Sequence, residues 1–477
     1  MDKTREKLVT YASDLSYSDL TPKAIHAVKR SVVDSIGCAI GAFDAEPVVA
    51  ARNLASQVTA ARPATIIGTQ IKSSPELAAF ANSAMIRYAD FNDDYFGGDG
   101  AFGPHPSDNT GAILAAAESA GVDVRTLILG IVIAYEICCQ MVDHTHLHPA
   151  RAPVRGWDYP ILHSIATAVG AGKVLGLSLE QMRNALSLAV VPNICLNQTR
   201  FGNLSNWKSL AGPNACRNGL FATLAAKEGI TGPAEPFEGK AGYMKQLPDQ
   251  FELAGAFGGN GTPFKIEGNY FKALPVRYGG QLIIWTALEL RNKVKLQDIE
   301  AICVYIEDRP SRIVSRADHP EYWDPVTRET ADHSYPYLVG AALIDGEITA
   351  RTFTPERYRD PAVLALVQKI RLAGDKEYNN DPWTYDCRIE ATLKSGAVIT
   401  VHQTNPKGHP ANPMSDAEIE EKFLKQVDAM LPGKQSRALL DQLWELEKLN
   451  DIQRLFALML VPVSRQQPVG LGVATGC

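Results

Sequence analysis

The spacing of apolar side chains over the first 255 residues is the feature that most constrains the fold of this chain. Apolar residues recur there at intervals of three and four positions, which is the period of an amphipathic helix. One such segment begins at Thr21-Pro22, a helix-start signal. Its apolar stripe comprises Ile25, Val28, Val32, Ile36 and Ile40. Another begins at Ser178, which can form a capping box with Gln181. The pattern predicts helix after helix, and hence a large all-helical domain.

The composition changes near residue 255, where the sequence GAFGGNGTP predicts a flexible break between two domains. Two domains are also expected for 477 residues, because a single core stops growing at a smaller size. Beyond the break, residues 299–307 alternate apolar and polar positions, and residues 388–401 have the pattern of a hairpin that turns at Ser395-Gly396. Helical patterns occupy residues 281–295, 334–344, 361–370 and 415–430. A smaller α+β domain is therefore expected.

Residues 436–460 return to a helical stripe that can pack on the first domain. The expected organisation is a helical domain formed by residues 1–262 plus 436–467, an α/β domain formed by residues 263–435, and a flexible tail from 468 to 477. The predicted fold class is mainly α, with a smaller α/β (α+β) domain.

Composition excludes several classes of protein. A formal net charge of -6 disfavours nucleic acid as a partner. The cysteines form no CxxC pair, which excludes zinc-ribbon and iron–sulfur spacings and suits a reducing compartment. The amino terminus lacks an apolar signal segment, so a cytoplasmic protein is expected. The most apolar run, residues 127–142, is interrupted by Glu136 and Gln140, so it predicts a buried helix and not a membrane span.

The segment DFNDDYFGGDGAFGPHPSDN, residues 90–109, concentrates acids, glycines and a histidine in a non-periodic stretch. It follows an amphipathic helix predicted over residues 75–89, which delivers Asp90, Asp93 and Asp94 to one place. Because clustered carboxylates repel one another, they are expected to lie next to cations, substrate or solvent. A solvated acidic loop is the alternative interpretation.

Lys208 in SNWKSLAGPNACRNG and Lys272 in FKALPVRYGGQ lie beside glycine and proline. A lysine held in place by such neighbours can bind a carboxylate ligand as a point charge, although most lysines lie at the protein surface. Other residues that could share their pocket are Arg217, His105, Asp158, Asp332 and His333. Together these cations and acids suit a small polycarboxylate. His333 has a structural alternative, which is pairing with Asp332 or capping the helix that follows.

Three other kinds of site are disfavoured. The motifs SNWK and SDN resemble parts of penicillin-recognising enzymes, but their order is reversed and no KTG follows. The alternating histidines at 144, 146 and 148, with Asp143, could bind a metal, but they lack a nearby cysteine or an HExxH arrangement and a loop is expected there. The glycine-rich segments lack the strand and helix that a nucleotide cradle requires. No metal and no cofactor are therefore predicted.

Six segments, in chain order, resemble the MmgE/PrpD family of 2-methylcitrate dehydratases and cis-aconitate decarboxylases. They are ADFNDDY with HPSDN, RGWD with GKVLGLS, WKSLAGPNACRNG with AAKEGITGP, YFKALPVRYGGQ, RETADHSYPYLVGAALIDGEIT, and PKGHPANPMS. The resemblance covers nearly the whole chain. It implies a large helical domain built from the amino-terminal part plus the carboxy-terminal helices, with a smaller α/β lid inserted between them. It also implies a homodimer.

The resemblance further implies an active site between the domains that needs no metal or organic cofactor. The family positions that carry over are Asp90, Asp94, His105, Asp158, Lys208 and Lys272. Decarboxylases of the family have histidine where this chain has Asp158, so the resemblance favours the dehydratases. Asp94 stands where the family usually has threonine, which leaves the exact substrate open. Arg217 and His333 are expected to bind substrate.

The expected function is a hydro-lyase that removes water from a β-hydroxy tricarboxylate such as 2-methylcitrate or citrate. Lys208 and Lys272 would hold substrate carboxylates and stabilise the anion that forms on deprotonation. Asp158 and His105 would serve as acid and base, in an order that the sequence leaves open. The alternatives are a decarboxylase of cis-aconitate or an epimerase of a related diacid on the same fold. A non-catalytic binding protein is a third, disfavoured by so many titratable groups in one predicted cleft.

Overall fold

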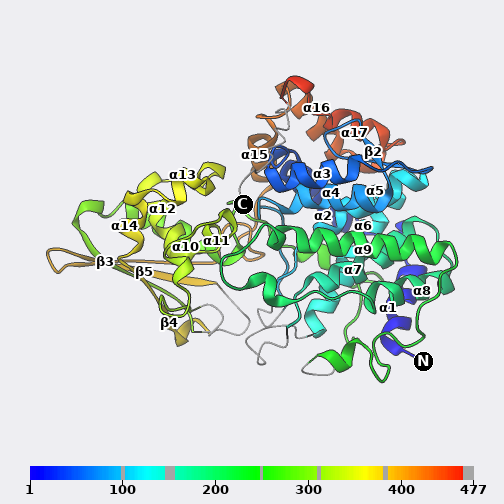
Figure 1. Cartoon of the computed structure of the whole chain (residues 1–477), viewed down its shortest axis with the longest axis horizontal. Helices are drawn as coiled ribbons and strands as arrows, with labels where there is room; N and C mark the ends of the chain where they lie inside the picture. Colours follow the sequence, from blue (N-terminus) through cyan, green and yellow to red (C-terminus); the bar gives the residue numbers. More distant parts are fainter. Residues whose placement is uncertain (98–102, 146–155, 248–250, 309–312, 380–384, 466–477) are drawn as a thin grey trace, which may run out of the picture.

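The computed structural model describes residues 1–97, 103–145, 156–247, 251–308, 313–379 and 385–465. A helical bundle and a smaller lobe built on a sheet lie side by side (Figure 1). The histidines expected at 146 and 148 and the tail expected from 468 lie outside the described residues.

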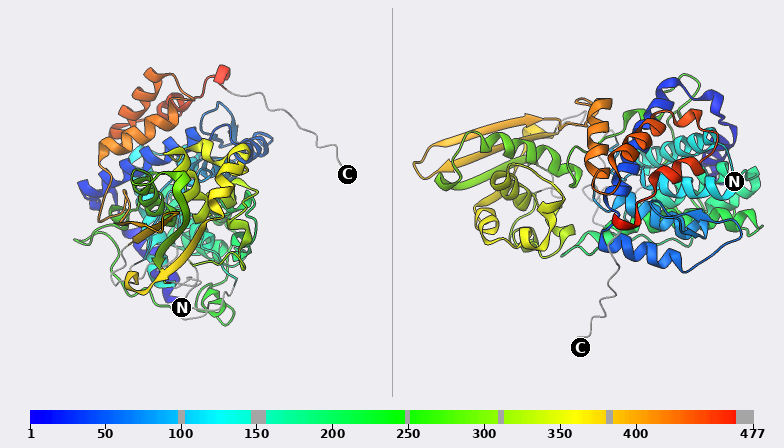
Figure 2. Two further views of the ribbon diagram at one scale, coloured as in Figure 1. Left: turned by 90° about the vertical axis from the view of Figure 1, so that its left-hand side faces the viewer. Right: turned by 90° about the horizontal axis from the view of Figure 1, so that it is seen from above.

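The bundle begins with nine helices of the described residues and a short two-stranded ribbon. They are α1 (Lys3–Asp14), α2 (Pro22–Gly41), α3 (Glu46–Ser56), β1 (Ala64–Thr65), β2 (Lys72–Ser73), α4 (Pro75–Arg87), α5 (Asp108–Ala120), α6 (Val124–Thr145), α7 (Pro160–Val174), α8 (Leu179–Val190) and α9 (Trp207–Lys227). The smaller lobe contains α10 (Tyr278–Arg291), β3 (Ile299–Glu307), α11 (Arg328–Ala331), α12 (Tyr335–Asp345), α13 (Pro355–Tyr358), α14 (Pro361–Val367), β4 (Ile370–Asp375), β5 (Asp386–Leu393) and β6 (Val398–Thr404). The chain returns to the bundle through α15 (Asp416–Val427), α16 (Gly433–Trp444) and α17 (Gln453–Met459), which lie over it in the view from above in Figure 2.

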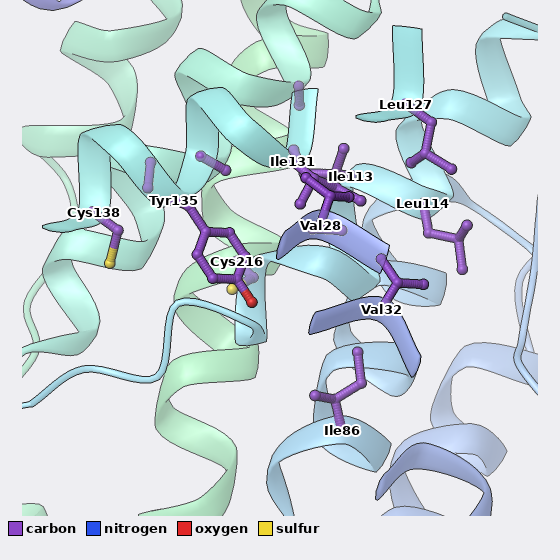
Figure 3. Close-up of a cluster of buried hydrophobic side chains, with 14 of the residues drawn as sticks. Val28, Val32, Ile86, Ile113, Leu114, Leu127, Ile131, Tyr135, Cys138 and Cys216 are labelled. Carbon is purple, nitrogen blue, oxygen red and sulfur yellow. The ribbon is translucent and has the colours of Figure 1, made fainter. Parts of the chain in front are cut away.

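Helices α6 and α7 form the centre of the bundle because both are apolar on almost every side. They approach closely at Gly130 and Gly170, where a methyl group on Gly170 would lie 2.8 Å from the Gly130 carbonyl oxygen. The close-up in Figure 3 shows Ile131 and Tyr135 of α6 among side chains from the neighbouring helices. The Tyr135 hydroxyl donates a 2.7 Å hydrogen bond to Asp93 Oδ2. The packed core therefore also holds the acidic loop that follows α4.

Among the described residues, α6 is the helix long and apolar enough to cross a membrane by length and composition. Inside this protein, however, 89% of its most apolar window is buried against other elements. It packs mainly on α7 and α5. The burial is that of a core helix, as the sequence predicted for residues 127–142.

The four-stranded sheet of the smaller lobe has the order β4-β3-β5-β6. Strand β3 runs parallel to β4 and antiparallel to β5, and β5 and β6 form the predicted hairpin. Gly396 in its turn has a φ of 86°, which glycine adopts without steric cost. The sequence predicted a helix over residues 361–370, but α14 ends at Val367 and Ile370 opens β4. This edge strand has a single buried residue at its start, so it lacks the alternation that identifies a half-buried strand.

Two hydrophobic clusters mark where the chain passes between the lobes. Phe271 belongs to the core of the bundle and Leu274 to that of the smaller lobe, so the first crossing lies near residue 273, later than the expected 263. On the return, Val401 belongs to the smaller lobe and Met414 to the bundle. Helix α15 therefore belongs with the bundle, whereas the sequence placed residues up to 435 in the α/β domain. The physical reason is its apolar face, which packs along α2.

Candidate active site

Asp90 is the point on which the charged groups of the site converge. It follows α4 and has a φ of 51°, a left-handed conformation that is rare for a residue other than glycine. Lys208 Nζ lies 2.7 Å from its Oδ2, while Lys272 Nζ and Arg87 Nη1 lie 2.5 and 3.0 Å from its Oδ1. Burial by itself would raise the pKa of Asp90, but Arg87 and the two lysines hold that pKa well below its ordinary range. Asp90 is therefore ionised and gathers three cations at one place.

Lys208 and Lys272 are buried ammonium groups from separate parts of the chain. Lys208 lies in the first turn of α9, and Lys272 lies where the chain passes into the smaller lobe; their exposed fractions are 1% and 0%. Burial lowers the pKa of Lys208 to about 8, and the nearby carboxylates of Asp332 and Asp90 limit the fall. An ammonium group has three N–H donors, more than Asp90 accepts from either lysine. Both lysines therefore have donors left for a ligand carboxylate.

His105 lies beside Asp90 as a neutral imidazole. Burial and the nearby Arg87 and Lys272 hold the pKa of His105 well below its ordinary value. Its Nδ1 lies 2.7 Å from the Asp93 carbonyl oxygen, which can only accept, so Nδ1 carries the proton. The lone pair is then on Nε2, which lies 4.0 Å from Asp90 Oδ1. A fixed lone pair of this kind is a proton acceptor.

Asp94 is in the same place as Asp90, but its pKa is shifted in the opposite direction. Burial raises the pKa of Asp94 well above its ordinary value, against the effect of Lys272, whose Nζ is 3.8 Å from Asp94 Oδ2. Its backbone pairs with that of Tyr270, which joins the acidic loop to the segment carrying Lys272. The site therefore contains two carboxyl groups of a single loop whose pKa values are shifted in opposite directions, that of Asp90 downward and that of Asp94 upward.

The smaller lobe contributes Asp332 and His333, at the junction of α11 and α12. His333 Nδ1 makes a short contact with Asp332 Oδ1, and His333 Nε2 lies 3.9 Å from Asp90 Oδ2. Arg328 Nη1 donates to the other oxygen of Asp332 at 2.9 Å. The two lobes thus meet at Asp90, and the site lies between them.

Asp90, Asp332 and His333 have ligand atoms within 4.8 Å of one another, a spacing that a metal ion can use. Lys208 Nζ lies among them, 2.7 Å from Asp90 Oδ2 and 3.5 Å from Asp332 Oδ1. A lysine ammonium group already neutralises these carboxylates, so the donor set suits an internal cation better than a divalent metal.

Asp158 is buried near the site, but its carboxylate is engaged by another partner. Its Oδ2 accepts from Arg200 Nε at 2.9 Å and its Oδ1 accepts from the Tyr159 backbone N–H at 2.9 Å. Burial raises the pKa of Asp158, against the effect of Arg200. Among the described residues, Asp158 forms an ion pair with Arg200 and none with Lys208 or Lys272.

Arg217 is not brought to the Asp90 cluster. It follows Lys208 by nine residues on α9, which for a regular helix is a distance of about 14 Å along the axis at 1.5 Å per residue. Its guanidinium group donates to the side chain of Asn218. The expected roles of Arg217 and Asp158 in binding or chemistry therefore remain predictions without a contact to this cluster.

Three residues of the site were not predicted from the sequence. Arg87 precedes Asp90 by three residues on α4, a spacing that could have identified an ion pair. Arg200 had no recognisable signal. Lys422 of α15 donates a 2.7 Å hydrogen bond to the Phe91 carbonyl oxygen and pairs with the buried Asp34 of α2, which braces the loop next to Asp90. Such a contact between segments far apart in the sequence cannot be read from local patterns.

Comparisons with known proteins agree with this architecture. Residues 6–255 match the MmgE/PrpD N-terminal domain, and residues 274–446 match the MmgE/PrpD C-terminal domain. Relatives include the cis-aconitate decarboxylase of Homo sapiens, 26% identical over 96% of this chain and 94% of that protein. The mitochondrial 2-methylcitrate dehydratase of Yarrowia lipolytica is 26% identical over 92% of this chain and 86% of that protein. The 2-methylcitrate dehydratase of Salmonella typhimurium is 25% identical, covering 90% and 91% respectively.

Proposed function

This chain belongs to the MmgE/PrpD family, and on that premise we propose that it is a lyase that removes water from a β-hydroxy tricarboxylate such as 2-methylcitrate or citrate. The observation that carries the proposal is the convergence of Lys208 and Lys272 on Asp90, beside the neutral imidazole of His105. The named relatives include both 2-methylcitrate dehydratases and cis-aconitate decarboxylases. The comparisons support a lyase, and the choice between elimination and decarboxylation rests on the site.

Substrate binding is assigned to the two lysines. A tricarboxylate brings three negative charges, and the N–H donors that Asp90 does not accept can bind two of its carboxylates. Deprotonation of the carbon next to a carboxylate spreads negative charge onto that carboxylate, where the buried ammonium groups stabilise it. Preorganised charges in a water-poor site are usually the largest contribution to such a reaction, and removing one donor costs on the order of 100 to 1,000-fold in rate.

Proton removal is assigned to His105, because its lone pair is fixed by the hydrogen bond from Nδ1 to Asp93. The carbon-bound proton moves to Nε2, the carbon–carbon double bond forms, and the carbon–oxygen bond breaks as the hydroxyl group leaves with a proton as water. Asp158 was the other candidate for acid or base. Its ion pair with Arg200 supports a positioning role instead, in which it holds the guanidinium group of Arg200 against the Tyr159 ring.

Decarboxylation of cis-aconitate is the second candidate, because a named relative carries out this reaction. Loss of carbon dioxide leaves a carbanion that an acid must protonate, and imidazole is suited to that step. The residue at 158 is an aspartate here, which favours elimination. Epimerisation of a related diacid would use the same deprotonation without loss of the hydroxyl group.

We propose further that the protein acts in the cytoplasm as a homodimer, without metal or organic cofactor. The exposed apolar side chains that follow α8 and lie on α9 support an association surface. They include Val191, Ile194 and Phe221, which are 56%, 74% and 61% exposed.

The test is to incubate the purified protein with 2-methylcitrate and with citrate and to identify the products by mass. Loss of one water from either acid supports the proposal. If neither acid is converted and no other β-hydroxy tricarboxylate is dehydrated, the protein is not a hydro-lyase of this class.

A further inference from the structure

Two imidazole groups face the same carboxylate from the two lobes. His105 comes from the loop before α5 in the bundle, and His333 comes from the junction of α11 and α12 in the smaller lobe. Their Nε2 atoms lie 4.0 and 3.9 Å from the two different oxygens of Asp90. A substrate held by Lys208 and Lys272 therefore lies within reach of a proton-transfer group on each side.

The two imidazoles differ in the partner of Nδ1, and this difference assigns their roles. Nδ1 of His105 donates to a neutral backbone carbonyl, that of Asp93. Nδ1 of His333 contacts a carboxylate, Asp332, which Arg328 fixes in turn. A carboxylate stabilises an imidazolium ion much better than a carbonyl oxygen does. His333 is thus the better carrier of an extra proton, and His105 is the better acceptor.

From this geometry, and resting on the proposed function, we propose that His333 is the catalytic acid and that Asp332 positions it. In the reaction, His105 Nε2 takes the carbon-bound proton and the electron pair of that bond forms the double bond. The carbon–oxygen bond breaks, and the proton on His333 Nε2 moves to the departing oxygen to give water. Afterwards His105 returns its proton to solvent and His333 takes one up, so the site returns to its starting state.

The position of His333 depends on how α11 docks on the bundle. The backbone N–H of Leu204, just before α9, donates to the Thr330 hydroxyl at 2.9 Å, and the Thr327 hydroxyl donates to the Leu204 carbonyl at 2.8 Å. These bonds fix α11 next to Lys208. The side chain of His333 is 14% exposed, against 6% for His105, so His333 can exchange protons with solvent more easily.

Substrate charge decides when His333 is protonated. The charged groups that face it are Asp332 on its own segment, Lys208 on α9, Asp90 after α4 and Arg277 before α10. Without ligand, burial and Lys208 lower the pKa of His333 to about 3. Three substrate carboxylates offset the charge of Lys208 and raise this pKa, which favours the acid form in the complex.

The test compares two substrates, 2-methylcitrate and its analogue in which fluoride replaces the hydroxyl group. Fluoride can leave as an anion, whereas the hydroxyl group must be protonated in order to leave as water. We expect His333→Gln to lower kcat on the hydroxy acid by about 100 to 10,000-fold, the usual range for a lost general acid, with KM nearly unchanged. The same variant should keep most of its activity on the fluoro analogue. His105→Gln should lose activity on both substrates.

The matched control is His402→Gln, because His402 also pairs with an aspartate in the smaller lobe but its side chain is 48% exposed. Asp332→Asn should shift the loss of activity at high pH toward lower pH, because the imidazolium ion loses its stabilising carboxylate. Equal losses of His333→Gln on both substrates, or retention of activity on the hydroxy acid, would overturn the assignment. Absence of water elimination by the wild-type protein would instead count against the proposed function itself.

Discussion

Two buried aspartates, Asp90 and Asp158, show how surroundings decide the state of one type of side chain. Both residues are 1% exposed. Asp90 contacts Arg87, Lys208 and Lys272, and its pKa lies well below the ordinary range. Among the described residues, Asp158 forms an ion pair with Arg200, and burial raises its pKa. Several converging cations therefore overcome the cost of burying a carboxylate, whereas one partner does not.

The same difference separates residues that can bind an anionic ligand from residues that hold other side chains in place. Around Asp90 the cations outnumber the ionised carboxylates that they contact, so the cluster can accept an anionic ligand. Around Asp158, in the part of the chain that the structure describes, the carboxylate pairs with the guanidinium group of Arg200, and their charges cancel. If this division sets which residues matter for activity, substitutions around Asp90 should have larger effects than substitutions elsewhere.

The largest expected effect is on the two lysines. Lys208→Ala and Lys272→Ala should each lower kcat/KM by on the order of 100 to 1,000-fold, because each removes a charge that stabilises the anionic transition state. The measurement is steady-state kinetics on 2-methylcitrate, with circular dichroism to confirm folding. Lys173→Ala is the control, since Lys173 lies on α7 and donates to the Ser13 carbonyl oxygen, away from the site. A lysine variant with near-normal kcat/KM would show that the cation is dispensable.

The second prediction concerns stability and pH. Asp90→Asn should destabilise the fold by about 3 to 5 kcal/mol at neutral pH, because it leaves buried cations without their carboxylate, and Asp158→Asn should cost clearly less. The depressed pKa of Asp90 means that its contribution is present above about pH 4, the unfolded value, and is lost as pH falls toward the folded value. The raised pKa of Asp158 has the opposite sign, so its ionisation reduces stability as pH rises through the folded value.

Urea unfolding of both variants and the wild-type protein, at pH 7 and again about one pH unit below the unfolded pKa of an aspartate, measures the contrast. The penalty of Asp90→Asn should shrink at the lower pH. If both substitutions cost the same at both values, the number of neighbouring cations does not set the ionisation of these two residues.

The sequence predicted several residues of the Asp90 cluster but not its separation from Asp158, which it placed in the same site. Asp90, His105 and Lys272 come from loops and Lys208 from the first turn of α9, and the structure brings these four together. Arg87 was missed because it lies at the end of the regular pattern of α4, where only its spacing of three residues from Asp90 indicated an ion pair. The catalytic role expected of Asp158 stays a prediction, because a motif gives the position of a residue along the chain but not the direction of its side chain.

The same limit applies to the fold. The helical pattern over residues 415–430 correctly predicted α15, and at its start Ser415 and Glu418 form a capping box with both hydrogen bonds present. Its assignment to the smaller lobe differs from the structure, because an amphipathic stripe indicates that a helix is packed but not which surface it packs against. Only the tertiary contact with α2 decides that.

A smaller effect is expected at Arg217, the predicted substrate ligand that lies along α9 from the cluster. Arg217→Gln should change kcat/KM by no more than about twofold, since surface and peripheral substitutions away from such features usually act within about 0.5 kcal/mol. Kinetics on the same substrate check this. A tenfold rise in KM would return Arg217 to the binding site and would extend the site well beyond Asp90.

No effect is expected from chelation. Lys208 already neutralises Asp90 and Asp332, so activity should survive prolonged treatment with EDTA followed by gel filtration. The check is residual activity together with metal analysis of the treated protein. Complete loss, restored by iron or zinc, would mean that a metal performs the role assigned here to the lysines.

The central claim is that this site removes and adds water and does not release carbon dioxide. The most direct measurement supplies the wild-type protein with cis-aconitate and follows carbon dioxide and all acids by mass. The account predicts gain of one water to give a β-hydroxy tricarboxylate, with no carbon dioxide above the protein-free control. Steady production of carbon dioxide and itaconate at a rate exceeding hydration would contradict it and make decarboxylation the function of the chain.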